Sequence, residues 1–240
     1  MTILWNHVSA MTTYFGHDPG CHALGTISVP RACRGAALFR TPHALYDTLM
    51  STPLIRKRCH RYNLPGHSHF LTFSCFRRLP LLGRDRTRNW LASAIEAARE
   101  SHDFAVLAWV FMPEHAHLLI APQRREYDIS AILKSIKQPV TQRAVHYLRA
   151  HAPTFLVQLE DRQPNGDLSY RFWQRGGGYD RNIVGATEYA EKIGYIHRNP
   201  VKRGLVSKAE EWEWSSAGDF MKMSAGPIRV DTVLTWSLTW

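Results

Sequence analysis

Apolar residues along the chain fall into short runs that predict strands and into spaced sets that predict helices. A run of about five to eight residues rich in Val, Phe, Ile and Leu is typical of a strand. The predicted strands span residues 69–76, 104–111 and 116–121. Apolar residues that recur every three or four positions indicate helices with one buried side. The predicted helices span residues 86–101, 128–149 and 187–198.

Single residues refine these elements. In the first strand Leu71, Phe73 and Cys75 alternate with polar residues, which predicts one face toward a core. Pro139 is expected to kink the second helix, because its ring clashes with the preceding turn. Thr187 is expected to cap the start of the third helix.

The order strand, helix, strand, strand, helix is the opening of a ferredoxin-like α+β unit. Such a unit is an antiparallel sheet, or palm, backed by helices. Two further segments, 154–159 and 168–173, are expected to form a hairpin across a Pro-Asn-Gly turn. Residues 205–223, which include Trp212 and Trp214, are expected to pack as a cap on the palm.

The chain divides into one predicted domain with appendages, as its 240 residues allow. Residues 58–223 carry the periodic pattern and form the predicted domain. Residues 1–57 begin with a long, nearly uncharged stretch without a sustained period, so we expect a poorly structured extension. Met50 is an alternative start of the natural protein. Residues 224–240 form a tail for which the pattern predicts no element.

The charge of the chain favours a polyanionic partner. Its net charge is +10 and its pI is near 9.7. Residues 54–90 hold nine Lys and Arg against the single acidic Asp85, and residues 175–203 hold a second basic group. No basic amphipathic helix with a bulky apolar face accompanies them, so nucleic acid is favoured over a membrane surface.

Several features predict a cytoplasmic protein without a membrane anchor. No apolar run approaches the length of about 18 residues that a membrane-spanning helix needs. The first residues lack the basic head and the coherent apolar block of a signal peptide. The four cysteines show no C-x-x-C spacing, which fits a reduced chain.

Cations and aromatic rings surround three glycines at 176–178, which predict a flexible loop or a close approach of backbones. Single-stranded nucleic acid binds where bases stack on rings beside positive charge. The predicted DNA-binding residues of this segment are Arg171, Trp173, Arg175, Tyr179 and Arg181. Further predicted DNA contacts are Arg77, Arg78, Lys134, Lys137 and Lys192. The alternative is a surface loop with ordinary core aromatics, beside solvated helix faces.

Two histidines stand one residue apart at the start of the third predicted strand. Because side chains alternate along a strand, His115 and His117 project from one face. Two imidazoles side by side on a rigid strand make half of a metal site. A second pair, His67 and His69, shows that this spacing alone is weak evidence. Strand-edge histidines without a ligand are the alternative.

Tyr195 lies off the apolar stripe of the last predicted helix. Asn199 follows one turn later on the same side, and Lys192 lies close by. A phenol and an amide beside a cation, away from the core, are more than a buried tyrosine needs. The alternative is an exposed tyrosine near a helix end that an Asn-Pro pair stops. The stripe itself consists of Tyr189, Ile193 and Ile196.

Four motifs follow one another along the chain. They are Pro-Glu-His-Ala-His-Leu-Leu at 113–119, Arg-Phe-Trp-Gln-Arg-Gly-Gly-Gly-Tyr-Asp-Arg at 171–181, Tyr-Ile-His-Arg-Asn-Pro-Val-Lys-Arg-Gly-Leu-Val at 195–206 and Trp-Ser-Ser at 214–216. In this order they resemble the REP-associated tyrosine transposases, single-tyrosine relatives of the HUH single-stranded-DNA transposases. The ordered set is more specific than any one motif, and the resemblance covers about residues 58–220.

The resemblance implies a role for each residue that matches. His115, His117 and Asn199 match the ligands of a divalent metal, and mixed nitrogen and oxygen ligands suit Mg²⁺ or Mn²⁺. Tyr195 matches the nucleophile, which the family carries on a late helix of a ferredoxin-like palm. Glu114 stands where many relatives have Asn, so the resemblance assigns this side chain no role.

The implied function is metal-dependent nicking and rejoining of single-stranded DNA at hairpin or REP-like sequences, through a 5′-phosphotyrosine intermediate. Such a transposase would work on the bacterial nucleoid as a monomer or a homodimer. One alternative is a domesticated, non-catalytic protein that binds hairpin DNA. A replication initiator or relaxase with the same site is another. A zinc hydrolase is disfavoured, because no convincing carboxylate base accompanies the two histidines.

Overall fold

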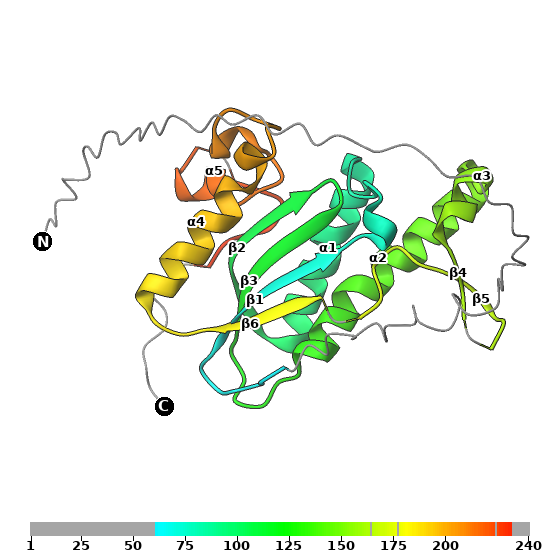
Figure 1. The fold of residues 1–240 in the computed structure, drawn as a ribbon. Coiled ribbons are helices and arrows are strands. Elements are labelled where there is room, and N and C mark those ends of the chain that lie inside the picture. The colour runs from blue at the N-terminus through cyan, green and yellow to red at the C-terminus, as the bar shows by residue number, and fades with distance from the viewer. Residues whose placement is uncertain (1–60, 164, 177, 224, 232–240) are drawn as a thin grey trace, which may run out of the picture. The chain divides into compact units, whose positions relative to one another are not determined.

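The computed structural model describes residues 61–163, 165–176, 178–223 and 225–231. Its main sheet is antiparallel, with the strand order β2-β3-β1-β6 (Figure 1). The strands are β1 (Ser68–Ser74), β2 (Phe104–Met112), β3 (His115–Pro122) and β6 (Tyr179–Ile183). The expected ferredoxin-like α+β palm is therefore confirmed, and β6 completes it as the edge strand beside β1.

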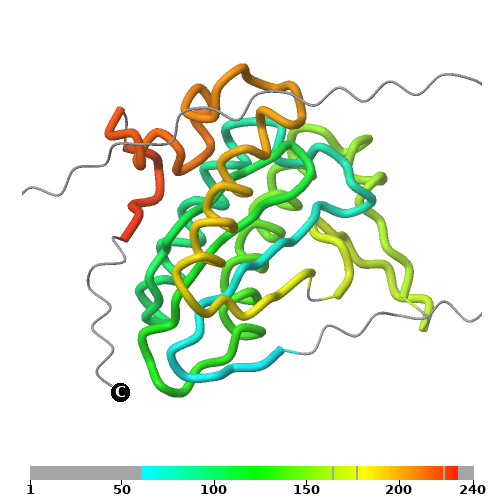
Figure 2. The backbone as a smooth tube through the Cα atoms, turned by 60° about the vertical axis from the view of Figure 1, so that its left-hand side comes forward, coloured from blue at the N-terminus to red at the C-terminus, as the bar shows by residue number. Residues whose placement is uncertain are grey.

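Three long helices cover the two faces of this sheet. They are α1 (Asp85–His102), α2 (Ile129–His151) and α4 (Ala186–Lys202). Figures 1 and 2 show α1 and α2 on one side of the sheet and α4 on the other. The alternation along β3 explains both cores: Leu118 and Ile120 pack toward α1 and α2, while Leu119 packs toward α4. By the same alternation the histidines of β3 lie on the α4 side.

The start of α2 agrees with the expected one, whereas both ends of α4 differ from those expected. The side chain of Asp128 caps α2 by accepting a hydrogen bond from the Ser130 amide, and the helix continues through Pro139. Thr187 does not cap α4, because Gly185 occupies the N-cap position with a φ of 93° that suits glycine. The same helix runs through Pro200 to Lys202, four residues past its expected end.

A predicted strand at 154–159 is wrong, because this segment is helical. It forms α3 (Pro153–Leu156) and the short 3₁₀ helix η2 (Val157–Leu159). Pro153 occupies the first turn, where proline is favoured, and Leu156 and Leu159 are buried at a spacing of three residues. The expected hairpin exists but begins later, as β4 (Glu160–Arg162) and β5 (Leu168–Tyr170).

Other short helical turns connect these elements. They are η1 (Phe76–Arg78), η3 (Ala209–Glu211) and α5 (Ala217–Phe220). The region around η3 and α5 packs on the palm as expected, since the Trp212 indole donates to the Phe111 carbonyl at 3.0 Å and Trp214 packs against the larger core. Within the described residues no helix is long and apolar enough to cross a bilayer.

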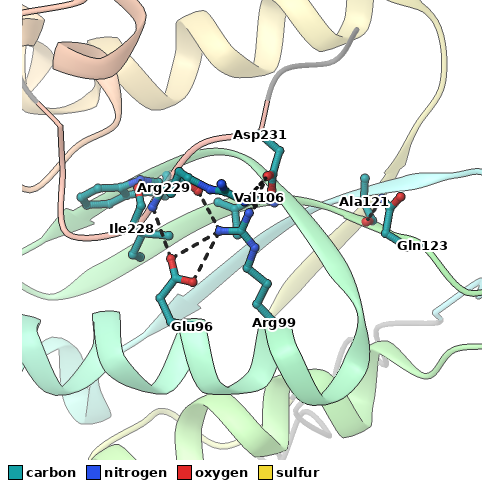
Figure 3. A network of polar contacts seen from close by, with 9 residues as sticks. Glu96, Arg99, Val106, Ala121, Gln123, Ile228, Arg229 and Asp231 are labelled. Atoms are coloured by element: carbon teal, nitrogen blue, oxygen red, sulfur yellow. Dashed lines mark hydrogen bonds and ion pairs between the residues drawn. The ribbon is translucent and has the colours of Figure 1, made fainter. Parts of the chain in front are cut away.

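The outer edge of β2 is covered by the C-terminal part of the chain (Figure 3). The Phe111 amide donates to the Trp214 carbonyl at 2.8 Å, and the Trp109 amide donates to the Ser216 hydroxyl at 3.0 Å. Further along, the Asp231 amide donates to the Val106 carbonyl at 2.8 Å.

The Asp231 carboxylate accepts from the Val106 amide at 2.9 Å and pairs with Arg99 of α1 at 2.5 Å. Residues 225–231, for which the sequence predicts no element, thus close this edge. The predicted extension 1–57, the start at Met50 and the end of the tail lie outside the described residues.

Candidate active site

Two imidazoles meet at the start of β3. The Nε2 atoms of His115 and His117 lie 3.1 Å apart, and the two residues are only 8% and 4% exposed. Burial lowers the pKa of His117 to about 3, with a smaller contribution from His115. Burial also lowers the pKa of His115, and Glu114 opposes this effect. Both rings are therefore neutral near pH 7, which is the form that binds metals.

The outer nitrogens of the two rings contact different side chains. The Nδ1 atom of His117 lies 2.8 Å from the Thr72 hydroxyl, and Thr72 is its register partner on β1. The Nδ1 atom of His115 lies 3.3 Å from a carboxylate oxygen of Glu114, without the angles of a hydrogen bond. The same oxygen pairs with Arg203 at 3.1 Å, which ties the β2–β3 turn to the end of α4.

Tyr195 of α4 faces this pair across the sheet surface. Its ring centroid lies 5.2 Å from that of His117 and 5.8 Å from that of Phe70. Phe70 in turn stacks on His117 at 5.4 Å, so the three rings form one cluster. Tyr195 is 39% exposed, which leaves its side chain accessible to a substrate. Two ammonium groups flank the cluster: Lys202 is 5.7 Å from the Tyr195 ring, and Lys192 is 5.6 Å from the Phe70 ring.

Asn199 lies one turn after Tyr195 on the same side of α4 and is 8% exposed. The predicted apolar stripe holds as well, because Ile196 is buried and Tyr189 and Ile193 pack against the core on that side. Two distant parts of the predicted site therefore come together: the ring of Tyr195 on the late helix is in contact with His117 of the imidazole pair.

The geometry of the pair suits a metal ion. Two nitrogen ligands about 2.1 Å from one ion are about 3.0 Å apart at a right angle and about 3.4 Å apart at the tetrahedral angle. The observed 3.1 Å between the Nε2 atoms lies in this range. If both rings carry their proton on Nδ1, two lone pairs face each other, and a cation between them removes the repulsion. The described residues contain no group of three His, Cys, Asp or Glu side chains that could hold an ion. A third protein ligand here would come from another side-chain type, such as the amide of Asn199.

Several predicted DNA-binding residues line one cavity of about 460 Å³ between α2 and residues 170–176. They are Lys134, Lys137, Arg171, Trp173 and Arg175. Trp173 is 5% exposed, and its indole donates to the Lys137 carbonyl at 3.0 Å while packing on Phe73. Its burial leaves little ring surface for stacking on a base, so the core role given above as the alternative fits this residue better.

The other predicted DNA contacts are spread around the palm. Tyr179 is half exposed on β6, and Arg181 pairs with Glu188 at 2.6 Å. Arg77 and Arg78 follow β1 with positive φ angles of 53° and 59°. The positive charge of Arg78 contributes to the low pKa of His115, so this guanidinium acts on the site electrostatically.

The second histidine pair has a structural role at one of its members. His69 is fully buried, and its ring contacts the Asp180 carboxylate at 2.8 Å and the Tyr127 hydroxyl at 2.9 Å. This environment satisfies both ring nitrogens. The two His-x-His motifs therefore differ: His69 is a core histidine with both ring nitrogens bonded, whereas His115 and His117 converge on each other.

Sequence reasoning missed Thr72, Phe70 and Arg203, and it left Glu114 without a role. Phe70 and Thr72 lie on β1 on the same face as the histidines of β3. The alternation of the first strand already predicts Thr72 opposite its buried face. What it does not give is the register that sets Thr72 beside His117.

Comparison with known proteins finds relatives of this chain. The family model described as "Transposase IS200 like" matches residues 66–199. A REP-associated tyrosine transposase of Escherichia coli (strain K12) is 27% identical over 181 residues, which cover 69% of this chain and 94% of that protein. A protein of Haemophilus influenzae is 25% identical over 140 residues, 55% of this chain and 74% of its own length. A solved structure of a REP-associated tyrosine transposase bound to a REP hairpin shares the fold, with a TM-score of 0.53 and 24% identity. That likeness covers 72% of this chain and 91% of the other.

Proposed function

The chain belongs to the IS200-like transposase family, and on this premise we propose that it nicks and rejoins single-stranded DNA at hairpins through a covalent bond to Tyr195. The observation that carries the proposal is the contact between the rings of Tyr195 and His117, with centroids 5.2 Å apart. It joins a nucleophile from α4 to the imidazole pair of β3, although 78 residues separate them in the sequence.

Tyr195 acts as the nucleophile in this proposal. Its phenolic oxygen gives up its proton and forms a bond to the phosphorus of a phosphodiester, the bond from phosphorus to the 3′-oxygen breaks, and the 3′-oxygen takes up a proton and leaves as a hydroxyl. Because a phosphodiester is kept as the 5′-phosphotyrosine, a 3′-hydroxyl can reverse the step without an external energy source. A phenol with an ordinary pKa near 10 is a weak nucleophile. The ammonium group of Lys202 lies 5.7 Å from the Tyr195 ring and places a positive charge beside the proposed nucleophile.

His115, His117 and Asn199 would hold a divalent cation, Mg²⁺ or Mn²⁺. Such an ion neutralises charge on the non-bridging oxygens of the phosphodiester. The chain's own residues prepare the place: burial keeps both rings neutral, and the Thr72 hydroxyl fixes the orientation of His117. Glu114 is the carboxylate beside the pair, but it lies at Nδ1 of His115 and pairs with Arg203. This position disfavours a zinc hydrolase, in which a carboxylate base would face the metal side.

The proposed substrate is hairpin DNA of the REP type with a single-stranded flank. The name of the Escherichia coli relative and the REP hairpin in the solved neighbour support this choice. The net charge of +10 supports a nucleic-acid partner.

The test is formation of a covalent adduct. The full chain is incubated with a labelled hairpin oligonucleotide from beside the gene and Mn²⁺, and the products are separated under denaturing conditions. We expect a labelled protein band that requires Mn²⁺ and is absent from Tyr195→Phe. Tyr62→Phe is the matched control, because Tyr62 is an exposed phenol (62%) outside the ring cluster.

Two results would contradict the proposal. An unchanged adduct in Tyr195→Phe would exclude this residue as the nucleophile. Tight hairpin binding by the unmodified chain without any adduct would favour the non-catalytic hairpin-binding protein instead.

A further inference from the structure

The cavity between α2 and residues 170–176 concentrates positive charge. Its cationic side chains are Arg61, Lys134, Lys137, Arg171 and Arg175. Among the described residues that line it, none is acidic. Its volume of about 460 Å³ exceeds the space that a few ordered waters fill.

The arginines of this cavity already have carboxylate partners. Arg171 and Arg175 both pair with Asp161 of the β4–β5 hairpin, Arg175 at 2.8 Å. Arg61 pairs with Asp180 at 3.3 Å. These three arginines therefore hold the wall of the cavity in place.

Lys134 and Lys137 differ from the arginines. In the described part of the chain no carboxylate lies within ion-pair distance of either ammonium group, whereas the arginines are paired. Lys137 is half-buried, and burial together with Arg61 lowers its pKa to about 8. A cation that is partly removed from water and placed near another cation lacks compensation, and a bound anion would supply it.

The cavity adjoins the same end of β1 as the imidazole pair. The Gln174 amide donates to the Ser74 carbonyl at 2.8 Å, and Ser74 is the register partner of His115. Two strand spacings, or about 10 Å, therefore separate the backbones of Gln174 and His115. The cavity opens on the α2 side of the sheet and the pair on the α4 side. A strand of DNA that ran from one to the other would pass around this end of β1.

We infer that this cavity binds the phosphodiester backbone of the single strand that flanks the hairpin, with Lys134 and Lys137 as the phosphate contacts. The inference rests on the proposed function, because it takes its substrate from it. Cations on both walls of the cavity suit a chain of phosphates better than one small anion. The contact is independent of base identity, so it positions the strand rather than reading its sequence.

The test measures the affinity of the full chain for a fluorescein-labelled DNA hairpin with and without a single-stranded oligothymidylate flank. Fluorescence anisotropy is recorded over a range of salt concentrations, in EDTA so that no cleavage occurs. The variant is Lys134→Gln/Lys137→Gln. Arg143→Gln is the matched control, because it removes one charge from the same helix at an exposed position outside the cavity lining.

We expect the double variant to lose affinity for the flanked hairpin only. Each phosphate contact to a single strand contributes about 0.7 to the salt slope, so two lost contacts reduce it by about 1.4 and lower the affinity about 25-fold at 0.1 M salt. The bare hairpin and the Arg143→Gln variant should change less than about twofold. Thermal melting checks that the variants fold.

An equal loss for flanked and bare hairpins, or no loss at all, would overturn the inference. The outcome is separate from that of the proposed function. If the double variant loses flank binding but the unmodified chain forms no covalent adduct, the cavity assignment stands and Tyr195 is rejected as the nucleophile. If the adduct forms but the double variant binds the flank as before, Tyr195 stands as the nucleophile and the cavity assignment is rejected.

Discussion

Replacing Thr72 by valine removes one hydroxyl beside the proposed metal site and keeps the shape of the side chain. The hydroxyl lies 2.8 Å from Nδ1 of His117, whose ring is almost fully buried. In the tautomer proposed for metal binding, the Nδ1–H group of His117 donates to the Thr72 hydroxyl, and Nε2, the atom that faces His115, carries no proton. We expect Thr72 to favour this tautomer, in which the lone pair of Nε2 is available to a cation.

The size of the effect follows from this geometry. Without the hydroxyl a buried N–H loses its acceptor, which costs about 1–3 kcal/mol. The ring avoids this cost by moving its proton to Nε2, which lies 3.1 Å from the Nε2 atom of His115 and can donate to it. That tautomer blocks the metal-facing atom. We therefore expect Thr72→Val to weaken Mn²⁺ binding about 10- to 100-fold, or about 1.4–2.7 kcal/mol.

The assay is the electron paramagnetic resonance signal of free Mn²⁺ during titration of the full chain without DNA. Thr72→Ser is the control, because it keeps the hydroxyl and should retain most of the affinity. Melting curves of both variants show whether the palm is intact. Wild-type affinity in Thr72→Val would refute the tautomer argument, and so would an equal loss in Thr72→Ser.

Further predictions concern three other residues, Gly178, Lys137 and Asp231. Gly178→Ala should lower the free energy of unfolding by at least about 1–3 kcal/mol in urea melts, since φ is +73° and the new Cβ would lie 2.1 Å from the Thr72 carbonyl oxygen. Affinity for a flanked hairpin should fall as pH rises through about 8, because Lys137 then loses its charge. Over about pH 8–10.5 the free energy of unfolding of the free chain should rise with pH, because the Lys137 side chain binds more protons in the unfolded state than in the folded state there. Asp231→Asn should lower the free energy of unfolding by about 1.5–3 kcal/mol, since it breaks the ion pair with Arg99.

Each of these predictions has its own control. Gly176→Ala also has a positive φ, +90°, but no atom lies near its added Cβ, so a smaller loss isolates the clash at Gly178. The pH effect on hairpin affinity should disappear in Lys137→Gln, and its persistence there would assign it to another group. For the C-terminal segment, Arg229→Gln tests a more exposed arginine, 3.6 Å from Asp231, and an equal loss would show that the pair with Arg99 is not special.

The palm could be predicted from the sequence because its elements carry strong local patterns. The strand at 104–111 and the helix at 128–149 both agree with the observed elements within about two residues. The segment 154–159 misled the prediction because a short apolar run fits either a strand or a helix, and Pro153 decided the matter. The end of α4 was placed too early because Asn199 and Pro200 pack into the palm, which overrides the effect of proline on its predecessor.

Part of the candidate site could likewise be predicted from local patterns, and part of it could not. His115 and His117 share a face by simple alternation, and Tyr195 departs from an apolar stripe, so both could be found by pattern. The hydroxyl of Thr72 and the ion pair of Glu114 with Arg203 depend on strand register and on where α4 ends. No local signal gives these distances, because they arise only when residues far apart in the chain pack together.

Closure of the β2 edge by residues 214–216 and 228–231 restricts how two copies of the palm could join. The backbone amides of Val106, Trp109 and Phe111 are already bonded to groups of the same chain. A continuous sheet formed by β2 from two molecules would first have to strip this segment away. Pairing of β2 with β2 of a second copy would therefore cost the hydrogen bonds that this edge already makes within the chain.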